Sequence, residues 1–492
     1  MTRVKLSRNV DVLIAGAGPA GLVAGITLAR YGITVQVVDK RGELAGLSKA
    51  FCISTRGMEL MRRFGLEQPI RAGAADVRLH AWLTPDLASA QGTELPLGHP
   101  SDAEAAAVSP TRPAWAPQNH HEPVLLDCLR GMPSATVRFG CELRHVWQDS
   151  GGVQATVADV TTGQAELLSA RYLIAADGAH STVRERLGIA MTGSGDLADY
   201  ERVEFSAPVW QIVGERRYAL YLITGLGTPG VVAAHGRTGR WSLSREIPVD
   251  ARGLAELNGA EITDLIRRAA GTSTLPIKVE RLSTFTFAAQ MAERYRAGRC
   301  FLAGDAAHRM TPRGGTGMNT AIQDSFDLGW KLAWVLRGWA TPSLLDSYER
   351  ERRPVAAHNV DQSSQPMGAI RDTEDALRWD LNGRMPHHWL PDQGSKISTL
   401  DLVGDGLTVF AAPADPRWAG LPAQRASGPP RAVRILDAAT AGALGLLAAG
   451  ALVTRPDGRE IQRWANFDDA TERARWSAIT AGSAHSPDMA RP

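Results

Sequence analysis

The sequence predicts an α/β protein in which a dinucleotide-binding domain with a parallel sheet is joined to a second domain built on an antiparallel sheet. Three observations predict this class. A glycine-rich turn near the N-terminus lies between two short apolar runs. A second glycine-rich turn follows another apolar run near residue 300. Between these turns, residues 200–287 contain several short segments with the composition of strands.

The N-terminal segment "VDVLIAGAGPAGLVAGITLARYGITVQVVDK" indicates a strand, a glycine turn, a helix and a second strand. Residues 10–15 form an apolar run typical of a parallel strand buried on both faces. Gly16, Gly18 and Gly21 form a GxGxxG motif, and Asp39 ends the second strand about 20 residues later. We expect a pyrophosphate at the helix N-terminus and a ribose hydroxyl on Asp39. The alternative is a structural turn with a surface aspartate.

The following segments suggest a departure from this domain and a return to it. Residues 84–117 are rich in Pro, Ala and Gly, and we expect them to leave the nucleotide domain. A helix and a strand are predicted next. The run "ARYLIAADGAHSTVRERLGI" then predicts a strand with a helix after Ser181.

The second glycine-rich turn lies in "RCFLAGDAAHRMTPRGGTGMN", which begins as an apolar strand and ends at a helix. Asp305 closes the strand and is placed to accept from a ribityl hydroxyl. Gly314, Gly315 and Gly317 let the backbone approach a flat group, and a helix N-terminus at Asn319 favours negative charge. Two such turns far apart in the sequence suggest one long cofactor that is held at both ends.

The C-terminal third is predicted to contain long helices and then a separate unit. "DSFDLGWKLAWVLRG" and "SYERERRPVAAHNVDQSSQ" are typical of helices, and a unit of roughly a hundred residues follows residue 390. "AATAGALGLLAAGALV" is too short for a membrane span, and we expect it to form a buried helix.

The composition excludes several classes of function. The net charge is +2 with no basic run, which gives no reason to expect nucleic acid or a membrane surface as partner. The N-terminal apolar run is too short for a signal peptide. The four cysteines form no CxxC pair and no zinc motif, so we expect buried free thiols, no metal and a cytoplasmic protein.

The motifs resemble those of single-component (class A) flavoprotein aromatic hydroxylases of the p-hydroxybenzoate and phenol hydroxylase kind. "GAGPAG", "ADGAHSTVR" and "GDAAHRMTPRGGTGMN" match in order, with "SKAFCISTRGMELMRRFGL" and "APQNHHEPVLL" between them. Two segments, "SKA…R" and "MPHHWL…STLDLVG", are most similar to the chlorophenol and polyketide hydroxylase branch. Lys49, Phe51 and Thr316 depart from the family's usual arginine, histidine, and glutamine or alanine.

The resemblance implies a Rossmann-like FAD-binding domain, a substrate-binding domain and a C-terminal thioredoxin-like domain without redox cysteines. The expected boundaries are residues 1–83, 108–190 and 281–397 for FAD, 84–107 and 191–280 for substrate, and 398–492 for the last domain. A homo-oligomer is possible on the same grounds.

The resemblance also implies which residues contact FAD. The expected set comprises the two glycine turns, the residues that follow the strands, and the DG motif: Gly16, Gly18, Pro19, Ala20, Gly21, Asp39, Lys40, Lys49, Gln118, Asp177, Arg184, Gly304, Asp305, Pro312, Gly315, Thr316, Gly317, Met318 and Asn319. Arg184 has a second interpretation as a helix-capping ion pair. His308 is expected to be structural.

The implied reaction is hydroxylation of a phenol-like or hydroxylated heteroaromatic ring, with NADPH or NADH and dioxygen, through a flavin hydroperoxide. Pro312, Tyr221 and His235 are the candidate catalytic residues, and Tyr218 is a further candidate for the pocket. Strand alternation predicts that Tyr218 and Tyr221 face opposite ways. Alternatives are Baeyer–Villiger oxygenation of a polyketide, a reductase, and a FAD-bound binding module without turnover. A halogenase is disfavoured because its lysine and tryptophan-rich signature are absent.

Overall fold

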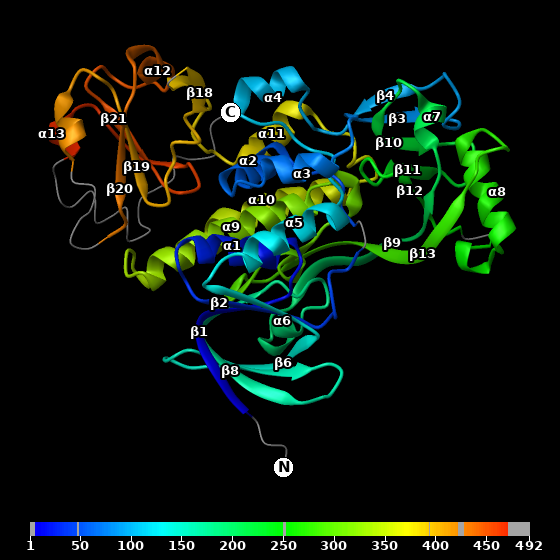
Figure 1. Ribbon diagram of the computed structural model, residues 1–492, viewed down its shortest axis with the longest axis horizontal. Coiled ribbons are helices and arrows are strands. Elements are labelled where there is room, and N and C mark those ends of the chain that lie inside the picture. Colours follow the sequence, from blue (N-terminus) through cyan, green and yellow to red (C-terminus); the bar gives the residue numbers. More distant parts are fainter. Residues whose placement is uncertain (1–4, 47–48, 249–251, 393, 422–427, 471–492) are drawn as a thin grey trace.

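The N-terminal glycine motif lies in a strand–helix–strand unit of the computed structural model, as the sequence predicts (Figure 1). The structure describes residues 5–46, 49–248, 252–392, 394–421 and 428–470. β1 (Lys5–Ala15) pairs in parallel with β2 (Val35–Asp39), and α1 (Pro19–Arg30) connects them. Val12, Leu13 and Ile14 of β1 and Val35, Val37 and Val38 of β2 are buried, which explains the apolar sequences of these segments.

The first sheet brings the ends of distant strands to one edge. Its main order is β14-β15-β8-β1-β2-β5, with β6 and β7 attached to β8, and the pairings from β15 to β5 are parallel. The carboxyl ends of β1, β8 and β15 therefore lie side by side, where open α/β sheets bind ligands. The remaining strands are β5 (Ala135–Phe139), β6 (Cys141–Gln148), β7 (Val153–Asp159), β8 (Ala165–Ala175), β14 (Arg296–Ala297) and β15 (Cys300–Leu302).

Helices cover this sheet and meet at close range. α9 (Gly317–Leu336) is buried over most of its length, and a Cβ at Gly329 would lie 2.8 Å from Cβ of Thr27 on α1. This glycine lets the two helix backbones approach each other. The neighbouring helices are α2 (Thr55–Arg63), α3 (Glu67–Gly73), α5 (Gln118–Arg130), α6 (Thr182–Arg186) and α10 (Asp346–Ser364).

The predicted second sheet is present, with order β16-β13-β9-β12-β11-β10-β3-β4. All neighbours are antiparallel except β10 and β3. One face packs on α8 (Gly259–Ala270), whose Ile262, Leu265 and Ile266 are buried in the same core as the sheet. The strands are β3 (Arg78–Thr84), β4 (Thr93–Pro96), β9 (Met191–Ser206), β10 (Tyr218–Ile223), β11 (Gly230–Ala234), β12 (Arg240–Glu246), β13 (Lys278–Ala292) and β16 (His308–Arg309); α4 (Asp102–Val108) and α7 (Val209–Val213) are short.

Two strands of the second sheet extend across expected domain boundaries. β3 pairs with β10 from Arg78 onwards, ahead of the boundary placed after residue 83. β13 runs through the boundary at residue 281 and pairs with β16 next to the second glycine turn. Composition does not mark the second crossing because β13 is one continuous strand through residue 281. The division into domains stays a prediction.

The C-terminal unit has its own four-stranded sheet, in the order β20-β19-β21-β22, with one parallel and two antiparallel pairs. The single buried helix predicted for "AATAGALGLLAAGALV" is wrong: α12 ends at Ala443 and β21 begins at Ala451. Gly445, at φ +67°, stops the helix. The elements are α11 (Thr373–Leu381), β17 (Trp389–Asp392), β18 (Ser395–Ser398), β19 (Leu407–Ala411), β20 (Arg431–Ile435), α12 (Ala438–Ala443), β21 (Ala451–Thr454), β22 (Glu460–Trp464) and α13 (Phe467–Ala470).

A buried ion network joins this unit to α9 and α10. Lys331 Nζ lies 2.6 Å from Asp327 and 3.0 Å from Glu351, and Arg455 binds both Glu351 and Asp457. The three carboxylates lie close enough together to hold a metal ion, but their charges are already matched by Lys331, Arg455 and Arg459, which lies 3.4 Å from Glu351. The network therefore fixes the C-terminal unit against the helix that carries the second glycine turn.

Candidate cofactor and active site

The first glycine turn is shaped for close approach of backbone to ligand. Gly16 has φ +101°, and a Cβ there would lie 2.1 Å from the carbonyl oxygen of Ala176. A Cβ at Gly21 would lie 1.9 Å from the Gly16 oxygen, so both positions require glycine. Gly18 caps α1 and meets nothing within 4 Å, which leaves open space at the helix N-terminus for a pyrophosphate. Pro19 and Ala20 form the first turn of α1.

Asp39 ends β2 and accepts a hydrogen bond from the glycine turn itself. Its Oδ2 accepts from the Ala17 N–H at 2.8 Å, and both oxygens accept from the Arg41 guanidinium. Burial alone would raise the pKa of Asp39, but the bonds from Arg41 and Ala17 outweigh it and keep the pKa below its usual value. The predicted ribose acceptor is therefore ionised and fixed in place. Lys40 is exposed, and no sequence motif indicated Arg41.

The DG motif lies against the same turn. Asp177 accepts from Ser181 Oγ and from the Val183 N–H, so it fixes the start of α6. Arg184 donates to the carbonyl oxygens of Ala179 and Ala306, at 3.2 and 3.4 Å. These bonds to main-chain carbonyl oxygens give Arg184 a structural role. They differ from the helix-capping ion pair that the second interpretation expected.

Gln118 begins α5, and its orientation is set by a residue that the sequence did not single out. Its Nε2 donates to Glu122 Oε1 at 2.7 Å, which leaves the amide oxygen of Gln118 free to point elsewhere. Glu122 is fully buried, and burial raises its pKa although Gln118, Arg41 and Lys49 act against this. The i, i+4 spacing on a helix is the only signal that could have linked these two residues.

The second turn begins beside the first. A Cβ at Gly304 would lie 3.1 Å from Cβ of Ala20, and Asp305 next to it is exposed. His308 is fully buried and lies 2.7 Å from Asp324, which Arg352 contacts on its other oxygen at 2.6 Å. This buried set holds the turn on α9 and α10, in agreement with the expected structural role of His308.

The loop after β16 and the start of α9 form the other end of the predicted cofactor site. Pro312 is exposed, and its carbonyl oxygen accepts from the Gly315 N–H at 3.1 Å. Gly315 has φ +63° and meets nothing within 4 Å on its Cβ side. No side chain caps α9 at Thr316, so the N–H groups of Gly317 and its neighbours are available to a ligand. Met318 is half-buried.

Asn319 joins this loop to the segment before α2. Its Oδ1 accepts from the Ser54 N–H at 2.8 Å, and its Nδ2 donates to the carbonyl oxygens of Cys52 and Gly315. The two loops that flank the predicted ring position are therefore held by one side chain.

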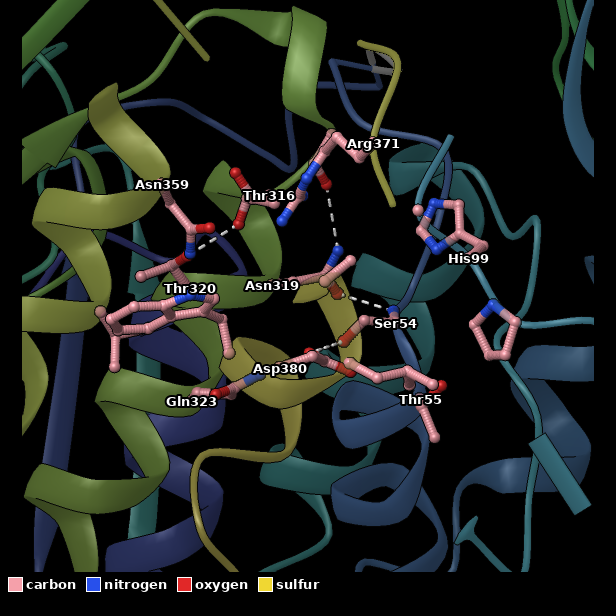
Figure 2. Close-up of a pocket in the computed structure, with 17 residues that line it drawn as sticks. Ser54, Thr55, His99, Thr316, Asn319, Thr320, Gln323, Asn359, Arg371 and Asp380 are labelled. Carbon is pink, nitrogen blue, oxygen red and sulfur yellow. Dashed lines mark hydrogen bonds between the residues drawn. The ribbon is translucent and has the colours of Figure 1, made fainter. Parts of the chain in front are cut away.

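A polar pocket opens behind Asn319, between α9, α10 and α11 (Figure 2). Asp380 lies at its base and accepts from Ser54 Oγ at 2.6 Å, from the Arg56 N–H at 2.9 Å and from Gln323 Nε2 at 2.8 Å. We call the series Asp380–Ser54–Asn319 the clamp. Arg371 and His99 line the other side of the pocket, and burial lowers the pKa of His99 to about 4.

Aromatic side chains from the segments before α2 and α5 gather beside the residue that follows β11. Phe51 stacks on Trp115 at 5.5 Å between ring centroids and lies 5.0 Å from the ring of His235. Arg202 lies over Phe51 on one side and Phe285 on the other. The predicted catalytic residue His235 thus contacts Phe51, and the carbonyl oxygen of the next residue, Cys52, accepts from Asn319 of the clamp.

Tyr221 lies in a different core from this aromatic group, and its catalytic role stays a prediction. Its hydroxyl donates to the Arg216 carbonyl at 2.7 Å, and its ring packs near Trp241 in the core beneath α8. Tyr218 lies in that same core, against the simple alternation. The register between β10 and β3 shifts after Tyr218, which turns both tyrosines to one side.

These features fit FAD. The cradle at Gly16 and Gly18 admits a pyrophosphate, Asp39 and Asp305 offer carboxylates beside it, and the uncapped α9 N-terminus lies at the other end. Among the described helices, none is long and apolar enough to cross a bilayer. Cys52, Cys141 and Cys300 are buried free thiols, and Cys128 is half-buried.

Comparisons with known proteins agree with this fit. The family model described as "FAD binding domain" matches residues 9–363. The chain is 33% identical to the tetracenomycin A2 monooxygenase-dioxygenase of Streptomyces glaucescens, over 92% of this chain and 93% of that protein. It is 36% identical to the 2,4-dichlorophenol 6-monooxygenase of Delftia acidovorans, over 81% of this chain and 71% of that protein.

Solved structures show the same architecture. The flavin-dependent monooxygenase PieE, in complex with FAD and substrate, superposes with a TM-score of 0.88 at 25% identity, over 97% of this chain and all of PieE. Aklavinone-11 hydroxylase, with FAD and aklavinone, gives 0.84 at 28% identity, over 98% of this chain and 99% of that one.

Proposed function

The chain belongs to the FAD binding domain family and is a FAD-dependent monooxygenase, and from that premise we propose that it hydroxylates a phenol-like or hydroxylated polycyclic aromatic ring with NAD(P)H and dioxygen. The observation that carries the substrate class is the aromatic group of Phe51, Trp115 and His235. Aromatic walls with few polar groups are typical of sites for flat ligands. Relatives named for tetracenomycin A2 and 2,4-dichlorophenol support the same class.

Bound FAD supplies the redox chemistry, accepting electrons from the nicotinamide and activating dioxygen. The residues proposed to hold it are those of the two turns. Gly16, Gly18 and the α1 N-terminus bind the pyrophosphate, and Asp39 and Asp305 accept from hydroxyl groups. Gln118 offers its amide oxygen, because Glu122 occupies its amide nitrogen.

The ring end is proposed to lie between the loops that Asn319 joins. The free N–H groups at Gly317 and Met318 then stabilise negative charge that develops on a bound group. The aromatic group of Phe51, Trp115 and His235 is proposed to exclude water from the reacting atoms. Pro312 keeps one lone pair of its carbonyl oxygen free to accept from a substrate hydroxyl, since Gly315 occupies the other.

Consumption of NADPH and NADH by the FAD-loaded protein tests the proposal, with a panel of chlorophenols, hydroxypyridines and hydroxyanthraquinones and with product masses recorded. Consumption of NADPH or NADH that is coupled to a gain of one oxygen atom by one class of compound would support hydroxylation. A lactone or ring-opened product would indicate insertion beside a carbonyl instead. Equal consumption with every compound and no oxygenated product would contradict the proposal.

A further inference from the structure

A strip of aromatic rings begins beside the second glycine turn and extends along β9 and β13. Tyr200 stacks on Phe287 with 4.1 Å between ring centroids and 3° between ring planes, and its centroid lies 5.7 Å from that of Phe285. Phe285 is directly opposite Tyr200 in the strand register, and Phe287 follows two positions later, so the three rings share one face of the sheet. We call Tyr200, Phe285 and Phe287 the aromatic strip.

The strip adjoins the loop that is proposed to flank the flavin ring. The Arg313 guanidinium lies over the Phe287 ring, 5.3 Å from its centroid, and Arg313 directly follows Pro312, which is exposed. Phe287 is 5% exposed, whereas Tyr200 and Phe285 are half-buried. Two of the three rings therefore offer apolar area to a flat ligand.

The end of the strip at this loop is positively charged. Arg309 Nη1 donates to Gln290 Oε1 at 2.9 Å, and Gln290 lies three positions beyond Phe287 on β13. Arg313 Nη1 donates to the Gln365 carbonyl oxygen at 3.5 Å. Within the part of the chain that the structure describes, neither guanidinium forms an ion pair with a carboxylate. Both therefore keep N–H donors for an anion that comes from solution.

The charges differ between the two sides of the strip. Arg309 belongs to β16, whereas Glu246, which is opposite Tyr200 in the strand register, belongs to β12. β13 and β9 lie between these two strands. The phosphates of a ligand are therefore attracted to the side of Arg309 and Arg313, away from the carboxylate.

A reduced nicotinamide dinucleotide fits this combination. It carries two flat rings and a charged pyrophosphate, and the proposed reaction requires it to reach the flavin. FAD itself is assigned elsewhere, with its phosphates at the first glycine turn and its ring between the loops that Asn319 joins. Aromatic side chains bind flat rings by stacking, and guanidinium groups match the oxygens of a phosphate.

We propose that the aromatic strip, Arg309 and Arg313 form the docking site for the nicotinamide dinucleotide. One ring of the dinucleotide lies against Tyr200 and Phe285, and its phosphates bind the two guanidinium groups. This inference rests on the proposed function and adds the place where its reductant binds. Docking here brings the reductant to Pro312, at the proposed ring end of FAD.

The test measures binding of a reductant analogue to the FAD-loaded full-length protein by isothermal titration calorimetry. The probe is 1,4,5,6-tetrahydro-NADP, which has the shape of NADPH but does not transfer a hydride. Arg309→Met and Arg313→Met are each expected to raise its dissociation constant about tenfold, because each removes a charged hydrogen bond to phosphate. Tyr200→Ala is expected to raise it about fivefold through the loss of stacking.

Arg268→Met is the matched control, because Arg268 is exposed on α8 and pairs with Asp264 there. It should leave the dissociation constant unchanged. Arg313→Lys keeps a positive charge and should lose less affinity than Arg313→Met. The separate substitutions keep the test decisive if one variant fails to fold.

A second probe, tetrahydro-NAD, lacks the 2′-phosphate and shows which phosphate is bound. A loss of affinity for both probes in the arginine variants assigns these side chains to the pyrophosphate. A loss for tetrahydro-NADP alone assigns them to the 2′-phosphate.

No binding of either probe to the wild type, or equal dissociation constants in all variants, would overturn the proposal. Weaker binding of a hydroxyanthraquinone to Tyr200→Ala, with unchanged binding of both probes, would also overturn it and would assign the strip to the aromatic substrate. Hydroxylation of the panel compounds is measured separately and would still stand in either case. Failure of this docking site is therefore distinguishable from failure of the proposed function.

Discussion

Asp380 gives the sharpest test of how the site is held together. Its Oδ1 accepts from Ser54 and Gln323, and its Oδ2 accepts from the Arg56 N–H at the start of α2. In Asp380→Asn, one of these donors must face an amide NH2 group, which cannot accept. The exchange leaves a buried donor without a partner and removes negative charge from a helix N-terminus.

Two costs and one gain determine how much Asp380→Asn changes the free energy of unfolding. An unsatisfied buried donor costs about 1–3 kcal/mol, and the lost charge at the helix end costs about 0.5 kcal/mol more. Against this, the neutral amide avoids the desolvation that raises the pKa of Asp380 in the wild type. We expect a net loss of about 2 kcal/mol in the free energy of unfolding.

FAD affinity should fall as well, because Ser54 positions Asn319 and Asn319 joins the two loops. We expect the dissociation constant for FAD to rise about tenfold, measured by quenching of flavin fluorescence. Asp375→Asn on the same helix is the control, since this half-exposed carboxylate pairs only with groups near it at the surface. Urea unfolding and FAD titration measure both effects. If Asp380→Asn has the same stability and the same FAD affinity as the wild type, the clamp does not hold the site together.

Three further predictions concern other parts of the chain. Gly16→Ala should abolish FAD binding in a titration, because the new Cβ would collide with the Ala176 carbonyl oxygen at a position with positive φ. Retained FAD binding would contradict the proposal that the first glycine turn holds the pyrophosphate. Tyr221→Phe should lower the free energy of unfolding by about 1 kcal/mol, measured in urea, because it removes the bond to the Arg216 carbonyl oxygen, and it should leave kcat unchanged. A large fall in kcat would instead support a catalytic role for Tyr221. The pKa of Asp457 is lowered to about 2, because the attraction of Arg455 outweighs the effect of burial. Ionised Asp457 therefore stabilises the fold by about 2 kcal/mol. This stabilisation is complete above about pH 4 and is lost as the pH falls through 2. Asp457→Asn should flatten this acid limb of the stability curve, and an unchanged acid limb would show that Asp457 is not its source.

The sequence predicted the parts of the site that lie in local motifs. The GxGxxG turn, Asp39 and the turn at Asp305 each follow a short apolar strand, and parallel pairing brings the strand ends together. Gly16 and Gly315 occur where positive φ is needed. Such features depend on neighbouring residues only, so a pattern in the sequence can indicate them.

The parts that it missed depend on contacts between distant residues. Asp380 reaches Ser54 across 326 positions, and Arg202 meets Ser244 only because β9 and β12 pair. The position of Tyr221 in the core beneath α8 could not be predicted, because a register shift changes the face of the strand without a mark in its composition. A single sequence holds no information on which buried polar groups meet.

The most direct test of the central claim is oxygen-isotope incorporation with the best phenol of the panel. The FAD-loaded protein, NADPH or NADH and ¹⁸O-labelled dioxygen are incubated, and the product is analysed by mass spectrometry. The proposed function predicts one ¹⁸O atom on the aromatic ring for each nicotinamide oxidised. Oxygen that comes from water, or oxidation of the phenol without added oxygen, would contradict it.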